Sequence, residues 1–320
     1  MRCLFVTHKW GDAAPDTGES VTIPHLIETF DEWGKGERQA VWTDEVFHAG
    51  RDIKRELLAA KASFRPELVV FTPIPNNALV SQNVPPRLMR QLGCPVLSVF
   101  FDLADPAVRR MSEPYAAASD LCVNVDGEQR PIGARFLALW AARTTRPPRD
   151  KTIDICFLGS RDGYPDRTEA LERLADAGIR VTVFGGRQEQ RCSFSEYLET
   201  LDASLITLNF SKTRSGLPQL KARVFEALAA RCCLVEDLNP VTSRYLAPNV
   251  DYVAWRTPDE LITRVRQLLS DRDRAHEIAE TGHRTFAARY SAAAFWQKIA
   301  DTLAEPAKPG MLFRLRQRFL

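Results

Sequence analysis

The chain has 320 residues, of which 45% are hydrophobic and 26% charged, a composition that excludes a disordered, fibrous or disulfide-stapled small protein. A single hydrophobic core rarely fills a chain of this length, so two domains are expected. Lys plus Arg total 43 against 41 for Asp plus Glu, and the net charge of +2 gives no overall attraction to nucleic acid or membranes.

Short apolar runs alternate with longer segments of helical spacing, which is typical of βα units around a parallel sheet covered on both faces. In the first half, strands are expected at Arg2–Thr7, Gln39–Thr43, Leu68–Phe71, Val96–Phe101 and Leu121–Asn124. Helices are expected between them at Ile23–Trp33, Ile53–Ala62 and Pro85–Leu92.

The stretch Ala141–Asp150 has no apolar periodicity and contains a Pro-Pro pair, so it predicts an interdomain linker with a solvated hinge of arginines at Arg143, Arg146 and Arg149. Strands are then expected at Ile153–Leu158, Arg180–Phe184, Leu205–Leu208, Cys232–Glu236 and Tyr252–Trp255. Helices are expected at Arg167–Ala177, Ser193–Leu201, Gln219–Ala230, Pro258–Ser270, Arg272–Arg289 and Ala292–Leu303, with a short turn helix near Val241–Leu246.

This order predicts an α/β protein with two doubly wound Rossmann-like domains facing a cleft. The N-terminal domain is expected over residues 1–145, the C-terminal domain over residues 146–305, and a basic amphipathic tail over residues 306–320. Ligands bind such sheets beyond the carboxyl ends of the strands, so the strand-to-helix loops are the candidate sites.

The seven cysteines are odd in number and lack the C-x-x-C spacing of a zinc or redox site, so they are expected as small core residues of a reduced, cytoplasmic protein. The first strand begins at Arg2, with no apolar stretch of the signal-peptide kind. No segment approaches the roughly 18 consecutive apolar residues of a membrane span.

The loop after the first strand of the C-terminal half, Leu158–Arg167, combines glycines with two arginines just before a helix. Glycine allows close approach of a ligand to the backbone, and arginine donates two parallel hydrogen bonds to phosphate, so the loop predicts an anion site. An ordinary turn whose arginines pair with Asp162 and Asp166 is the alternative. The loop matches neither the Walker pattern nor G-x-G-x-x-G.

A second segment, Leu208–Leu228, begins as a polar loop with two cations and leads into a helix with an aliphatic stripe of Leu220, Val224 and Leu228. Glu226 points away from this stripe. It is either a solvated side chain paired with Arg223 three residues earlier, or an acceptor of hydrogen bonds from sugar hydroxyls near the positive end of the helix.

The succession Phe157–Arg161, Val183–Gly185, Leu208–Asn209 and Lys221–Ala229 resembles the donor-binding half of GT-B glycosyltransferases of the group 1 superfamily. It looks most like their CgeB-like, spore-maturation branch. The resemblance covers about Ile153–Leu303, and the N-terminal half is similar in architecture only.

The resemblance implies a donor site in which Arg161 and Arg167 contact the diphosphate, Lys221 and Arg223 lie beside it, and Glu226 binds the ribose hydroxyls. The complete implied set is Gly159, Ser160, Arg161, Arg167, Asn209, Lys221, Arg223 and Glu226. Many retaining members carry a Glu eight positions before the ribose-binding Glu, where this chain has Pro218.

The implied activity is transfer of a sugar, hexosyl or related, from a nucleotide-diphosphate sugar to an acceptor hydroxyl on a glycan, lipid-linked molecule or protein. The resemblance further implies no metal and no cofactor beyond this co-substrate, and it favours retention at the anomeric carbon. Two alternatives are an epimerase or hydrolase of nucleotide sugars on the same fold, and a binding protein that has lost transfer.

In the N-terminal half, the long polar loop after the first strand carries His8 and Glu19, candidates to deprotonate or orient an acceptor hydroxyl. His8 is alternatively a core-edge imidazole bonded to backbone. Asp102, after an apolar strand, is the third candidate catalytic residue, and Asp105 before Pro106 predicts a helix cap.

The tail segment 311–320 combines apolar residues with three arginines. It predicts either a peripheral contact with the inner face of a membrane, which would bring the enzyme to a lipid-linked acceptor, or a terminal helix docked on the protein. The linker arginines are not interleaved with aromatic residues, so nucleic acid is not an expected partner.

Overall fold

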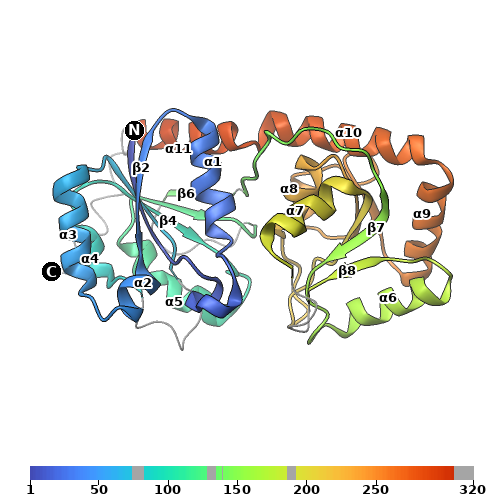
Figure 1. Ribbon diagram of the computed structural model, residues 1–320, viewed down its shortest axis with the longest axis horizontal. Coiled ribbons are helices and arrows are strands. Elements are labelled where there is room, and N and C mark those ends of the chain that lie inside the picture. The colour runs from blue at the N-terminus through green and yellow to red at the C-terminus, as the bar shows by residue number, and fades with distance from the viewer. Residues whose placement is uncertain (74–82, 128–134, 139, 186–191, 306–320) are drawn as a thin grey trace. The chain divides into compact units, whose positions relative to one another are not determined.

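A computed structural model of the chain describes residues 1–73, 83–127, 135–138, 140–185 and 192–305 (Figure 1). It divides into two compact units. Unit 1 comprises Met1–Leu139 and Ala292–Leu320, and unit 2 comprises Trp140–Ser291. Both units are α/β, as the alternation of apolar runs and helical segments predicted.

The described strands of unit 1 form one parallel sheet in the order β2-β1-β3-β4-β5-β6. Their bounds are β1 Arg2–Thr7, β2 Glu37–Trp42, β3 Leu68–Phe71, β4 Val96–Phe100, β5 Leu121–Asn124 and β6 Arg135–Ala138. Strands β1, β3, β4 and β5 are continuous apolar runs buried almost throughout, which is the pattern of a parallel sheet covered on both faces.

The helical segments of unit 1 are a π-helical turn at Ile23–Ile27, α1 Glu28–Trp33, α2 Thr43–His48, α3 Ile53–Phe64, α4 Pro86–Gln91, α5 Pro106–Ala117 and α11 Ala292–Ala304. One face of the sheet packs Leu4 and Val6 against apolar side chains of α2 to α5. Asp105 caps α5 through the Ala107 amide, as its place before Pro106 predicted.

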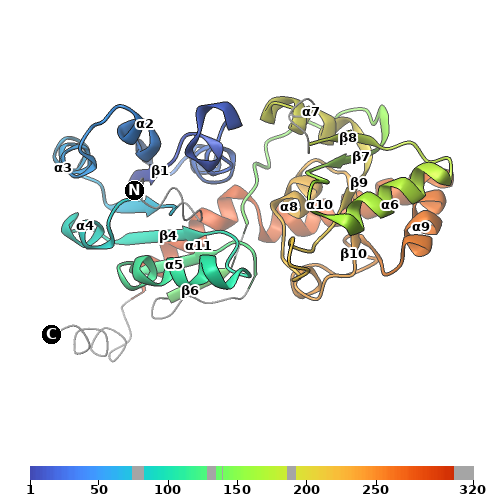
Figure 2. The same ribbon diagram turned by 90° about the horizontal axis from the view of Figure 1, so that it is seen from below.

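Helix α11 contributes to unit 1 although it follows unit 2 in the sequence (Figures 1 and 2). Trp296 is fully buried, its ring lies 5.0 Å from that of Phe30 and 5.9 Å from that of Phe5, and its Nε1 donates to Thr29 at 3.0 Å. The sequence-based division had placed this helix with the C-terminal domain, because periodicity shows that a helix forms but not which sheet it covers.

The described strands of unit 2 form a parallel sheet in the order β8-β7-β9-β10-β11. Their bounds are β7 Ile153–Leu158, β8 Thr182–Phe184, β9 Ser204–Asn209, β10 Cys233–Asp237 and β11 Val253–Trp255. In chain order this is the 2-1-3-4-5 arrangement, whose direction reverses between the first and third strands. A ligand crevice is therefore expected where β7 and β9 end.

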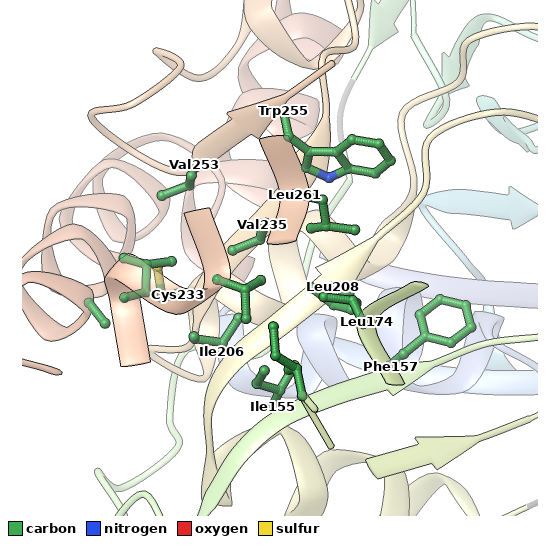
Figure 3. Close-up of a cluster of buried hydrophobic side chains, with 14 of the residues drawn as sticks. Ile155, Phe157, Leu174, Ile206, Leu208, Cys233, Val235, Val253, Trp255 and Leu261 are labelled. Atoms are coloured by element: carbon green, nitrogen blue, oxygen red, sulfur yellow. The ribbon is translucent and has the colours of Figure 1, made fainter. Parts of the chain in front are cut away.

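The helices of unit 2 are α6 Pro165–Asp176, α7 Phe194–Ala203, α8 Ala222–Ala229, α9 Pro258–Ser270 and α10 Arg272–Arg289, with a 3-10 turn at Thr242–Arg244. Ile155 and Phe157 of β7 face a core shared with α6, α9 and α10 (Figure 3). Cys156 and Leu158 face the opposite core with Leu201 of α7. The alternation follows from the two-residue period of a strand.

The sequence placed most of these elements but not helices α2 and α5 or strand β6. One expectation about the linker is wrong: Arg146 is not a solvated hinge residue. Its guanidinium forms an ion pair with Asp202 at 2.6 Å, and both side chains are largely buried.

Of the seven cysteines, Cys94 and Cys192 are half-buried and the other five buried, and all seven are free. The tail 311–320 lies outside the described residues.

Candidate functional site

The β7–α6 loop brings Gly159 against a side chain from another element. A β-carbon at Gly159 would lie 2.6 Å from Nη2 of Arg223, which projects from α8. The Gly159 amide donates to the Phe184 carbonyl at 2.8 Å. The glycine therefore permits close approach, as the sequence predicted, but it is the Arg223 guanidinium that fills the space.

Gly185 completes this contact at the end of β8. Its φ is +99°, a region that favours glycine, and a β-carbon there would lie 2.8 Å from the carbonyl carbon of Gly159. The loops after β7 and β8 thus touch backbone to backbone, and glycine at both positions brings Arg223 to the carboxyl end of β7.

Arg167 is 6% exposed and its guanidinium is used inside the protein. Nη1 donates to the Ser160 carbonyl at 2.8 Å, Nη2 donates to the Lys212 carbonyl at 3.3 Å, and the group lies 3.5 Å from the ring centre of Tyr164. Burial, with a contribution from Arg223, lowers the pKa of Arg167 to about 10. Arg167 ties the β7 loop to the β9 loop and stands near a second cation.

The alternative in which both loop arginines pair with Asp162 and Asp166 does not hold for Arg167, because Asp166 instead pairs with Lys212 at 3.0 Å. Ser160 also has an internal role: its hydroxyl accepts a hydrogen bond from the Asp162 amide at 3.1 Å. Arg161 lies half-buried in the same loop.

Arg223 is connected to the interior of the sheet through Asn209. Nη1 of Arg223 donates to Oδ1 of Asn209 at 3.0 Å, and Nδ2 of Asn209 donates to Oε1 of Glu236 at 2.7 Å. Nε of Arg223 is buried without a hydrogen-bond partner within the described part of the chain. The contact with Asn209 thus holds the guanidinium in place.

Glu226 lies one turn after Arg223 on α8 and is 6% exposed. Its Oε2 accepts a hydrogen bond from the hydroxyl of Tyr197 on α7. Burial, and then the nearby Glu226 carboxylate, raise the pKa of the Tyr197 phenol well above its usual value. The interpretation of Glu226 as a solvated residue is therefore wrong, because the side chain is buried against α7.

Helix α8 begins without a side-chain cap. Lys221 is its extended N-cap residue, and the ammonium donates to the Gln219 side chain. Val224, Phe225 and Leu228 are buried, and this apolar face holds the helix on the sheet. The positive end of α8 thus lies beside Arg223, next to the place where β7 and β9 end.

A separate cavity of about 480 Å³ opens beyond β9, β10 and β11, on the side of α6. It borders Arg167 but not Arg223 or Glu226. Its walls are formed by Gly163, Tyr164, Pro165, Asp166, Arg167, Glu169, Phe210, Lys212, Thr213, Arg214, Gly216, Asp237, Leu238, Trp255, Arg256 and Pro258.

The three candidate catalytic residues lie in unit 1 on two loops. His8 is 7% exposed, burial lowers its imidazole pKa, and its Nδ1 has no hydrogen-bond partner among residues that the structure describes. Glu19 is exposed and forms a backbone bridge with Trp10. Asp102 is exposed on the turn after β4 with φ of +58°, and its amide donates to Asp126.

Three residues that the sequence analysis did not single out organise these loops. Asp44 of α2 is fully buried and accepts hydrogen bonds from the amides of Lys9 and Trp10, which fixes the loop after β1. Tyr197 and Glu236 have the corresponding roles in unit 2. Glu236 carried a signal, a carboxyl in the otherwise apolar strand β10, whereas Asp44 and Tyr197 lie in polar helices whose sequences do not distinguish them.

The described residues contain no group of three or more His, Cys, Asp or Glu side chains arranged to hold a metal ion. None of their helices has the length and apolar character needed to cross a bilayer.

A family model described as Glycosyl transferase-like matches residues 167–301, somewhat less than half of the chain. No curated protein matches the sequence. Solved structures match over nearly the whole chain at low identity, and this likeness concerns the fold.

HepE from Anabaena, crystallised with UDP and glucose, is 11% identical with a TM-score of 0.62, covering 95% of this chain and 99% of its own. Sucrose-phosphate synthase from Thermosynechococcus elongatus is 11% identical with a TM-score of 0.60 and the same coverage. A DNA-modifying β-glucosyltransferase is 14% identical with a TM-score of 0.57, covering 94% of this chain and 99% of its own.

These matches confirm the glycosyltransferase assignment and the GT-B fold that the resemblance predicted. The family match spans α8, Arg223 and Glu226. The CgeB-like branch stays a prediction.

Proposed function

We propose that this glycosyltransferase moves a sugar from a nucleotide-diphosphate sugar, bound by unit 2, to an acceptor hydroxyl. The observation that carries the proposal is the placement of Arg223 against Gly159, at the reversal point of the sheet, with buried Glu226 one turn further along α8. HepE and the β-glucosyltransferase, which share the fold, were studied with UDP, glucose or uridine diphosphoglucose.

In this proposal Arg223, Arg161 and the first turn of α8 neutralise the leaving diphosphate, a task for which fixed cations and backbone amides serve without a metal ion. Glu226 accepts hydrogen bonds from the ribose hydroxyls while Tyr197 holds the carboxylate in place. Arg167 shapes the loop instead of meeting the ligand, because its guanidinium is committed to carbonyl groups.

His8 is the proposed acceptor-side base, with Glu19 and Asp102 as further candidates. Burial keeps its imidazole neutral at physiological pH, and a neutral imidazole can accept the proton of an acceptor hydroxyl. A hexosyl donor, a CgeB-like relationship and retention at the anomeric carbon are parts of the same proposal, and anomeric analysis of the product decides the last.

Donor binding is tested by thermal shift and calorimetry with UDP-glucose, GDP-mannose, ADP-glucose and dTDP-glucose. Ligand at a hundred times its Kd should stabilise the protein by about 2.7 kcal/mol. Arg223→Ala and Glu226→Ala should each weaken binding by about tenfold or more. Arg264→Ala, which removes an exposed ion pair on α9, is the control and should not change it.

Product analysis with and without acceptors separates the alternatives. Consumption of donor without an acceptor would indicate the epimerase or hydrolase, and binding without turnover would indicate a binding protein. If none of the four nucleotide sugars raised the melting temperature, the donor-site assignment would fail.

The basic tail, residues 311–320, is proposed to bring the enzyme to a lipid-linked acceptor. The full-length protein should co-sediment with anionic liposomes, whereas a chain ending at Glu305 should stay in the supernatant. Equal binding by both chains would dismiss this role.

A further inference from the structure

A carboxyl group lies behind the proposed donor arginine. Glu236, at the end of β10, is 0% exposed and stands directly opposite Asn209 of β9 in the strand register. The Asn209 amide donates to Glu236 and accepts from Arg223, so both of its ends are used. The orientation of the Arg223 guanidinium therefore depends on a fixed amide whose other end is held by Glu236.

The charged and titratable groups around Glu236 come from every neighbouring element. Asp237 adjoins it on β10, Arg223 approaches from α8, and the phenol of Tyr252 approaches from the segment before β11. The Thr242 hydroxyl faces it from the 3-10 turn, and Asn209 faces it from β9.

No cation lies within ion-pair distance of Glu236 among the residues that the structure describes. Its Oε2 has no hydrogen-bond partner in the same set. Burial, and then repulsion from Asp237, raise the pKa of this carboxyl to about 8, although Asn209, Thr242 and Arg223 act in the opposite direction. At neutral pH the carboxyl is therefore mostly neutral and adds no negative charge beside Arg223.

We propose that Glu236 is a positioning residue whose protonation state controls donor affinity through Asn209 and Arg223. This inference rests on the proposed function, because it assigns a control to the same donor site. In the neutral form, Glu236 holds the amide and leaves the guanidinium charge available to the diphosphate. In the ionised form, a buried negative charge one amide away offsets that cation and weakens anion binding.

The direction of the pH effect on donor affinity follows from the ionisation of Glu236. A carboxyl ionises as the pH rises, so donor affinity should fall as the pH passes through the folded pKa of about 8. The coupling is reciprocal, because a bound diphosphate adds negative charge and favours protonated Glu236. A coupling within the usual range corresponds to a change in Kd of about fivefold or more.

The test uses the full chain and UDP-glucose, whose diphosphate stays fully ionised over the range studied. Calorimetry between pH 6.5 and 9 should show wild-type Kd rising by about fivefold or more. Glu236→Gln keeps the shape and the acceptor for Asn209 but cannot ionise, so its Kd should hold its pH 6.5 value at higher pH. Asp237→Asn removes the repulsion and should move the wild-type midpoint to lower pH.

A second measurement, the pH dependence of protein stability, reports the ionisation of Glu236 in the absence of donor. Its raised pKa makes the folded state bind more protons than the unfolded state, so the free energy of unfolding should fall from pH 6 to 8. This fall should be smaller in Glu236→Gln. If Kd depends on pH equally in wild type and Glu236→Gln, control of donor affinity by Glu236 is overturned. If neither UDP-glucose nor the other nucleotide sugars bind at any pH, the donor site itself is overturned.

Discussion

The hydroxyl of Tyr197 on α7 donates a hydrogen bond to the carboxylate of Glu226 on α8. The two residues are 29 positions apart in the sequence, and both side chains belong to unit 2. The contact fixes the orientation of the Glu226 carboxylate, so removal of the Tyr197 hydroxyl should affect any ligand that Glu226 binds.

Tyr197→Phe should weaken nucleotide-sugar binding without preventing folding. The variant removes one hydrogen bond to a buried carboxylate, and such bonds contribute about 1.5–3 kcal/mol. The expected result is a rise of about tenfold in Kd measured by calorimetry. Tyr290→Phe is the control, because it removes a phenolic hydrogen bond to the Tyr245 carbonyl and should leave Kd unchanged. Equal Kd values for wild type and Tyr197→Phe would contradict the role of Tyr197.

Gly159→Ala should reduce donor affinity, whereas Gly185→Ala should reduce the stability of the protein. The new β-carbon at Gly159 meets the end of the Arg223 side chain, which can move, so donor affinity should drop as in Arg223→Ala while stability changes little. The new β-carbon at Gly185 meets backbone at a positive φ and should cost about 2 kcal/mol or more. Urea unfolding and calorimetry distinguish the two, and similar stability losses would speak against this packing.

Trp296→Ala should destabilise unit 1 by about 3–5 kcal/mol, because a fully buried indole in contact with Phe5 and Phe30 is replaced by a cavity. Gln297→Ala, on the next residue of α11, should change stability by about 0.5 kcal/mol or less. Denaturant unfolding checks both. A small effect of Trp296→Ala would mean that α11 is not part of the unit 1 core.

The stability of the chain should fall as the pH drops below about 6.5, the ordinary pKa of histidine. Burial lowers the pKa of His8, so the unfolded state binds more protons there and each such group contributes a slope of up to about 1.4 kcal/mol per pH unit. His8→Gln should have a shallower slope between pH 5 and 7, measured by urea unfolding.

His283 provides a comparison. Its pKa is also lowered by burial, and its Nδ1 lies 2.9 Å from the Leu228 carbonyl. His283→Gln should likewise reduce the slope, but only His8→Gln should also abolish transfer while leaving donor binding intact. Unimpaired transfer by His8→Gln would remove His8 as the proposed base.

Local sequence patterns were sufficient for most elements. Apolar runs such as Leu68–Phe71 and Ile153–Leu158 became strands with the predicted bounds, and Pro258–Ser270 and Arg272–Arg289 became the predicted helices. Helix α5 was not predicted, because Pro106 and Pro114 and a mixed polar face obscure its period, although its cap at Asp105 was recognised.

The residues proposed for the donor side could be predicted from the sequence because they cluster on two loops and one helix, but their tertiary contacts could not. Local spacing suggested that Arg167 meets phosphate and that Glu226 is either solvated or a ligand. The structure commits Arg167 to backbone carbonyls, and it buries Glu226 against Tyr197, which excludes only the solvated alternative. Such partners lie on different elements, so no short-range pattern contains them.

The sequence by itself determined two α/β units and the strand-to-helix loops where ligands are expected, because these follow from periodicity and the direction of parallel strands. Only the tertiary structure decided that Gly159 makes room for Arg223, that Asn209 joins Arg223 to Glu236, and that α11 returns to unit 1. The physical reason is that strand register and helix packing place residues in contact over long sequence separations, and burial then sets their charge.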